Sequence, residues 1–289
     1  TKYFRLTYQK NKPFYSGKFD TMKFLKVELL NSDRIWYYNH PEVRNYGSPS
    51  ISLDDNKGKL KLKKGLYSVD GFSSIDDSKN DVIESTGEFI ARDKNTVDTY
   101  LFMYLKDFAY CLKDYFMITG SPGLIPRYAL GNWWSKNESY NDASLKELID
   151  NFDEKKIPLS ILLLDKDWHY REYNNKKVDS GFTWNETNFE HPGNMITYLH
   201  KKGIRLGLNI DPMSGIYPYE QKFSELSSEL GTKNNEIIPF NVYDSKMINL
   251  YFDKLIHPLD DIGVDFFWLD DDELKKMKDT WSLNHYQFN

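Results

Sequence analysis

The chain has 289 residues, of which 40% are hydrophobic and 28% are charged, so it contains enough apolar side chains for a sizeable core. Its 38 Lys and Arg against 43 Asp and Glu give a net charge of −5, which argues against a nucleic-acid partner because such proteins are usually basic over one face. The single Cys111 excludes a disulfide framework and a cysteine-based zinc site within one chain. No apolar run approaches the roughly 18 residues of a membrane span and no signal-peptide pattern is seen, so we expect a cytoplasmic protein without a membrane partner.

The N-terminal part of the chain has the pattern of short strands joined by turns. Apolar-rich segments at residues 23–30, 34–38 and 99–105 are typical of strands, and Leu60 and Leu62 alternate with lysines at the period of a half-buried strand. Frequent short strands of this kind predict part of an antiparallel β-sandwich.

A helical segment follows these strands. Apolar side chains from Phe108 to Phe116 recur at helical spacing, and the segment ends at Gly120. We place a domain boundary close to residue 106, which gives an N-terminal β-sandwich domain over residues 1–106 and a second domain over residues 107–289.

In the second domain, predicted strands alternate with predicted helices. The strands lie at residues 129–134, 161–164, 204–210 and 264–269. The helices lie between them: one with Asp142 as its N-cap, one over residues 194–202 and one over residues 245–256. This alternation predicts a parallel sheet with helical crossovers, and we expect it to form the first four units of a (β/α)8 barrel.

Carboxylates follow three of these strands. They are Asp165 and Asp167 after the second strand, Asp211 after the third, and Asp270, Asp271, Asp272 and Glu273 after the fourth. A single Asp at a strand end is most often a turn or N-cap residue. In a (β/α)8 barrel, however, all strand C-termini point to the face where active sites are built, so these groups would converge there beside Trp168 and Trp268.

Converging carboxylates suit two kinds of site. They bind hard cations such as magnesium, and they supply the nucleophile and the proton donor of glycosidases. The chain is also rich in aromatic residues, at 16%, and such rings either fill a large core or match the flat C–H faces of sugars. The two tryptophans beside the acids favour the sugar site, because a metal site has no special need for them.

Five segments together carry a specific resemblance. They are LGNWWS at 130–135, LDKDWH at 164–169, GFTWN at 181–185, LNIDP at 208–212 and WLD at 268–270. In this order and spacing they resemble glycoside hydrolase family 31, the family of many α-glucosidases and α-xylosidases. The resemblance implies a retaining α-glycosidase that hydrolyses terminal α-glucosides or α-xylosides without a cofactor or a metal.

The resemblance also implies a role for individual residues. Asp270, at the end of the WLD segment, corresponds to the nucleophile that forms a covalent glycosyl-enzyme, and Glu273 to an acid that orients it. The expected substrate-binding residues are Asp165, Asp167, Trp168, Asp211 and Trp268. His169 is expected to be a supporting residue rather than a base.

Two departures from the family pattern affect this site. Where many relatives have Met-Asn after the nucleophile, this chain has Asp271-Asp272, whose charges would raise the pKa of Asp270. After the first strand, Lys136-Asn137 occupies positions where relatives often have Arg and an aromatic residue. Loss of that ring would remove one stacking wall and change the sugar preference.

The chain also ends before the barrel is complete. Four strands precede Asn289, whereas a full barrel needs eight, and the family's proton donor lies further downstream. We therefore expect the chain to be one piece of a larger polypeptide, or to pair with a complementing chain that supplies the remainder of the barrel. By itself it is expected not to hydrolyse aryl α-glycosides.

Two other functions fit the same residues. A non-catalytic carbohydrate-binding protein on this scaffold would explain the missing donor and the Asp271-Asp272 departure. A metal-dependent barrel enzyme would use the acids around Asp270 as ligands.

Overall fold

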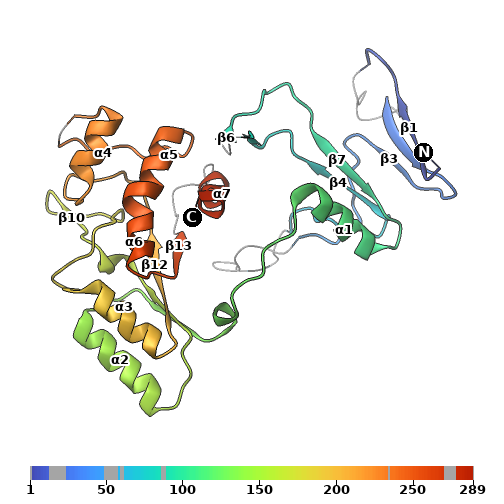
Figure 1. Ribbon diagram of the computed structural model, residues 1–289. Helices are drawn as coiled ribbons and strands as arrows, with labels where there is room; N and C mark the ends of the chain where they lie inside the picture. Colours follow the sequence, from blue (N-terminus) through green and yellow to red (C-terminus); the bar gives the residue numbers. More distant parts are fainter. Residues whose placement is uncertain are drawn as a thin grey trace. The chain divides into compact units, whose positions relative to one another are not determined.

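The computed structural model describes residues 2–12, 24–48, 58, 62–85, 89–233, 235–269 and 278–288 (Figure 1). By internal contacts the chain divides into two units, and each is considered by itself. The first comprises Thr1–Asn80 and Ala91–Gly123, and the second comprises Asp81–Ile90 and Leu124–Asn289. The domain boundary near residue 106 stays a prediction. Helix α1 (Phe108–Thr119), which follows that position, lies in the first of these units.

The first unit contains antiparallel strands, as its short apolar segments predict. Strands β1 (Phe4–Tyr8), β2 (Leu25–Leu29) and β3 (Ile35–Tyr37) form one sheet, and β4 (Phe72–Asp76) pairs with β7 (Thr99–Met103) in another. The segments expected to be strands at 23–30, 34–38 and 99–105 therefore contain β2, β3 and β7. Of the further strand expected around Leu60 and Leu62, residue 60 lies outside the described residues and Leu62 is not in a strand.

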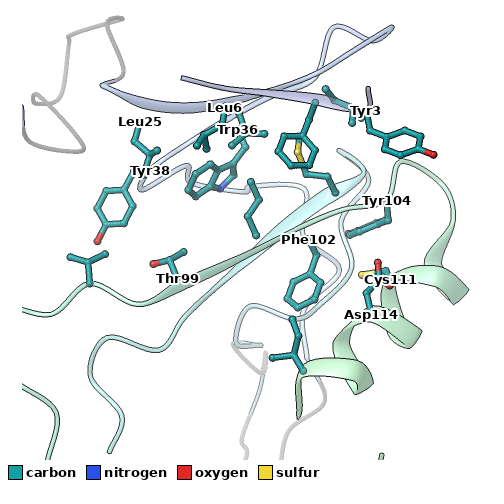
Figure 2. Close-up of a pocket in the computed structure, with 17 residues that line it drawn as sticks. Tyr3, Leu6, Leu25, Trp36, Tyr38, Thr99, Phe102, Tyr104, Cys111 and Asp114 are labelled. Carbon is teal, nitrogen blue, oxygen red and sulfur yellow. The ribbon is translucent and has the colours of Figure 1, made fainter. Parts of the chain in front are cut away.

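An apolar cavity of about 690 Å³ lies inside the first unit (Figure 2). Its walls include Trp36 from β3, Phe102 from β7 and Cys111 from α1. Among the described residues that line it, Asp114 is the only carboxylate, so the cavity lacks the paired acids of a glycosidase.

The second unit is built on a parallel sheet in the order β13-β12-β9-β8, of which Figure 1 labels β12 and β13. Its strands are β8 (Trp133–Lys136), β9 (Ile161–Leu164), β12 (Arg205–Ile210) and β13 (Phe266–Leu269). The expectation of a parallel sheet is confirmed. One strand starts later than predicted: residues 127–130 form the 3₁₀ helix η1 (Arg127–Leu130), because the Gly131 amide bonds to the Tyr128 carbonyl and closes the turn.

Helices connect these strands as the alternating pattern predicts. The connecting helices are α2 (Asp142–Glu154), α3 (Pro192–Lys201), α4 (Phe223–Leu230), α5 (Ser245–Tyr251) and α6 (His257–Asp261), and α7 (Lys278–Phe288) follows β13. The expected cap of α2 is wrong by one residue, since Asn141 accepts hydrogen bonds from the backbone amides of Ala143 and Ser144, and Asp142 is the first helical residue. No helix in the described part of the chain has both the length and the apolar character of a bilayer span.

The helix expected over residues 245–256 has an irregular second half. A π-helical turn, η3 (Phe252–Ile256), joins α5 to α6. Pro258 follows, and it lacks the amide hydrogen that a regular helix would bond to the carbonyl of Lys254. The remaining short elements are β5 (Val82–Ile83), β6 (Phe89–Ile90), β10 (Glu172–Tyr173), β11 (Lys176–Lys177) and η2 (Lys166–Trp168).

The two faces of the parallel sheet have different surroundings. On one, the helix face, alternate strand residues such as Leu162 and Leu206 join a core with Ile149 of α2 and Leu199 of α3. On the opposite face, Gly207 pairs with Phe266, and the Phe266 ring lies so close that an added Cβ at Gly207 would be 2.3 Å from it. This second face is the one that carries the predicted site residues.

Candidate active site

Three side chains form a row where the strands of the sheet end. Leu164 of β9 pairs with Leu208 of β12, so the next residues along, Asp165 and Asn209, are neighbours. The Asn209 amide Nδ2 donates to Asp165 Oδ1 at 3.2 Å. Asn209 in turn pairs with Trp268 of β13, and paired residues of parallel strands project to the same face. Asp165, Asn209 and Trp268 therefore lie side by side.

Trp268 and Asp165 have the exposure that a sugar site requires. Trp268 is 49% exposed, although it lies in a strand, and Asp165 is half-buried. An exposed indole provides a flat apolar surface, and a partly buried carboxylate provides oxygens that accept hydrogen bonds from hydroxyl groups. The row thus offers an apolar ring face and a hydrogen-bond acceptor on the same face of the sheet.

Asp167 has different partners from Asp165. Its carboxylate accepts a hydrogen bond from Ser139 and forms an ion pair with Arg171 at 2.8 Å. Partial burial alone would raise the pKa of the carboxyl, but the Ser139 hydroxyl and the Arg171 guanidinium outweigh it and lower the pKa from its ordinary value. Arg171 also bonds to the Val178 carbonyl and to Asp179, so Asp167 helps to fix the loop that follows β9.

Trp168 lies in the core behind this row. It is only 1% exposed, and its indole Nε1 donates to the backbone carbonyl of Asn209 at 2.8 Å. Its ring packs edge-on against Trp184 with centroids 5.0 Å apart. Direct contact of Trp168 with a sugar stays a prediction that this burial does not favour, whereas support of Asn209 is what its hydrogen bond provides.

His169 is also buried. Its Nδ1 lies 2.7 Å from the carbonyl oxygen of Tyr170, and Gly181 leaves room for the ring, since an added Cβ there would be 2.0 Å from Nδ1. Burial lowers the pKa of His169 to about 4, so the imidazole is neutral near pH 7. Because the ring is only 1% exposed, it is closed off from a substrate, which suits the expected supporting role better than that of a base.

The remaining predicted acids follow β12 and β13. Asp211 is half-buried, and its Oδ1 accepts from the Met213 amide at 3.0 Å, which closes the turn after β12. Asp270 and Glu273, together with Asp271 and Asp272, lie outside the described residues. Their roles as nucleophile and orienting acid stay predictions.

Two buried and hydrogen-bonded polar residues were not predicted from the sequence. Asn209 lies two positions before Asp211, so the two-residue period of a strand was a signal for its place on the same face. Glu220 is 4% exposed, and it accepts hydrogen bonds from the Phe182 amide at 3.1 Å and from the Thr183 hydroxyl at 2.6 Å. Nothing in the sequence around Glu220 distinguishes it from a surface acid.

The described residues contain no group of three or more His, Cys, Asp or Glu side chains arranged to hold a metal ion. The acids at 270–273 are not among them, so the metal hypothesis for that cluster is not tested by this observation.

Comparisons with known proteins match most of the second unit to one family, and some relatives match part of the first unit as well. Residues 122–288 match the sequence model of the family described as "Glycosyl hydrolases family 31 TIM-barrel domain". The chain is 28% identical over 232 residues to an α-xylosidase of Saccharolobus solfataricus, which covers 79% of this chain and 26% of the relative. It is 26% identical over 185 residues to α-glucosidase 2 of Bacillus thermoamyloliquefaciens, covering 60% of this chain and 23% of that one.

Solved structures give a likeness of fold. A glycoside hydrolase family 31 dextranase of Flavobacterium johnsoniae, solved with glucose, superposes with a TM-score of 0.54 at 18% identity. The match covers 76% of this chain and 32% of that one. Of the α-xylosidase and the α-glucosidase named above, the chain spans about a quarter of the length.

Proposed function

Since the chain belongs to glycoside hydrolase family 31, we propose that it contributes the nucleophile side of a retaining α-glycosidase site for terminal α-xylosides or α-glucosides. The observation that carries the proposal is the row formed by Asp165, Asn209 and Trp268 at the ends of adjacent parallel strands. Relatives named as an α-xylosidase and an α-glucosidase support this choice of substrates.

The chemistry assigns one task to each side chain. The Asp270 carboxylate attacks the anomeric carbon, the bond to the leaving-group oxygen breaks, and a general acid gives that oxygen a proton. Water then attacks the glycosyl ester from the opposite side and releases a sugar of retained configuration. Asp165 accepts hydrogen bonds from sugar hydroxyls, and Trp268 covers the C–H face of the ring.

The fold arrangement is part of the proposal. The antiparallel strands of the first unit belong to a β-sandwich portion, and β8, β9, β12 and β13 are the first four strands of a (β/α)8 barrel. Their parallel order and the helices on one face of the sheet support this arrangement.

A hydrolysis assay tests the function. The protein, produced as its gene encodes it, is expected to cleave 4-nitrophenyl α-xyloside or α-glucoside, with the α-anomer of the sugar appearing first in proton NMR spectra. Asp270→Ala is expected to lower kcat by about a thousandfold or more, because the covalent step is lost. The matched control is Asp253→Asn, at a solvent-exposed acid of the η3 turn.

The outcomes separate the alternatives. Release of the β-anomer first, or full activity of Asp270→Ala, would contradict the retaining mechanism. Sugar binding without hydrolysis would instead favour a non-catalytic carbohydrate-binding protein, and loss of activity with a chelator would favour the metal-dependent enzyme.

A further inference from the structure

Asn209 is held in place from several directions. Its side chain is 6% exposed and donates Nδ2 to Asp165 Oδ1 at 3.2 Å. Its backbone carbonyl accepts the Trp168 indole at 2.8 Å, and its backbone pairs with Trp268 in the adjacent strand. Because the strand ladder and the Trp168 indole fix the backbone of Asn209, its side chain loses little further conformational freedom when it bonds to Asp165.

The amide group suits the carboxylate beside it. Nδ2 can only donate, so it matches the acceptor oxygens of the Asp165 side chain and fixes one of them, Oδ1. Asn209→Ala would remove this donor. Asn209→Asp would keep the shape of the side chain but place a carboxylate oxygen, which accepts, opposite Asp165 Oδ1.

We propose that Asn209 is a positioning residue of the sugar site. It holds the Asp165 carboxylate in the orientation in which that group receives sugar hydroxyls, in the row that ends at Trp268 on β13. This inference rests on the proposed function and adds to it a residue whose effect passes through Asp165.

A double-mutant cycle tests the inference. Asn209→Ala, Asp165→Asn and the double variant are compared for kcat and KM on 4-nitrophenyl α-xyloside and α-glucoside, and for binding of xylose and glucose by calorimetry. Asn209→Ala is expected to weaken binding and raise KM by roughly tenfold or more, with a smaller change in kcat, because a charged hydrogen bond orients the binding group. In the Asp165→Asn background the same change is expected to cost less than about threefold.

Controls keep a folding defect apart from a positioning effect. Asn209→Asp keeps the size of the side chain and is expected to weaken binding as well, and thermal unfolding confirms that each variant is folded. Asn249→Ala, at an exposed asparagine of α5, is expected to behave as the unmodified protein. Equal losses in both backgrounds, or a loss in kcat alone, would overturn the inference.

The failure of the proposed function gives a different result. If the unmodified protein neither binds xylose or glucose nor hydrolyses either glycoside, the function itself is wrong and the role of Asn209 falls with it. If it does bind or hydrolyse them and the two substitutions act additively, only the role of Asn209 is wrong.

Discussion

Carboxylates near the strand ends differ in what they contact, and this difference separates their tasks. Asp165 faces the neutral amide of Asn209, whereas Asp167 is bound to a guanidinium and a hydroxyl. The ion pair with Arg171 holds the Asp167 carboxylate in the loop after β9. The hydrogen bond from Asn209 instead holds Asp165 in the row at the strand ends, and this is why we propose Asp165 for substrate binding.

Glu220 gives a prediction about pH and stability. Burial raises the pKa of its carboxyl to about 7, against an ordinary value of 4.5, although hydrogen bonds from Thr183 and Phe182 oppose the rise. The folded protein therefore holds this proton more tightly than the unfolded chain. The resulting stabilisation is complete below the unfolded pKa and is lost as the pH rises through the folded one.

Urea unfolding at a series of pH values checks this. The free energy of unfolding is expected to fall by about 1–3 kcal/mol more in the unmodified protein than in Glu220→Gln as the pH rises from about 4.5 to about 8. Glu229→Gln, at an exposed acid of α4, is the control and should keep the original pH dependence. Equal pH dependence in the unmodified protein and Glu220→Gln would refute the assignment.

At the scale of elements, the packing of the Phe266 ring of β13 over β12 depends on a glycine. The ring of Phe266 occupies the space where a Gly207 side chain would lie, and it also packs edge-on against Trp133 with centroids 5.3 Å apart. Any side chain at position 207 would displace this ring. The face of the sheet below the site row is thus sensitive to a single methyl group.

Gly207→Ala tests this packing. It is expected to lower the free energy of unfolding by about 1–3 kcal/mol through overpacking, and to cost much less when Phe266→Ala is also present. Gly193→Ala in α3 is the matched control, since nothing lies within 4 Å of the added Cβ, and it should stabilise the helix by about 0.5–1 kcal/mol. An equal cost with and without the Phe266 ring would show that this ring is not what excludes a side chain at position 207.

The elements were largely predictable because their patterns are local. The continuous apolar run at 161–164 and the alternation around it identified the parallel sheet, which the strand pairing confirms. The start of β8 and the cap of α2 were misplaced, because a 3₁₀ turn and a capping box depend on hydrogen bonds that composition does not show. The contacts of Asn209 and Glu220 join residues far apart in the chain, so no local pattern could reveal them.

At the scale of the whole molecule, two units with different chemistry occur in one chain. The first holds an apolar cavity walled by strands and α1, and the second holds the acids and the exposed tryptophan at the strand ends. The family match covers residues 122–288, most of the second unit, and it is there that we propose the sugar chemistry.

Covalent trapping tests the central claim most directly. A 5-fluoro-α-xylosyl or 5-fluoro-α-glucosyl fluoride would react with the nucleophile at its anomeric carbon, release fluoride and leave a slowly hydrolysed glycosyl ester. Peptide mass mapping is expected to find the added sugar on the peptide that contains Asp270, and to find none in Asp270→Ala. A label on a peptide without Asp270, or none on a folded protein that hydrolyses aryl α-glycosides, would contradict the assignment of Asp270 as the nucleophile.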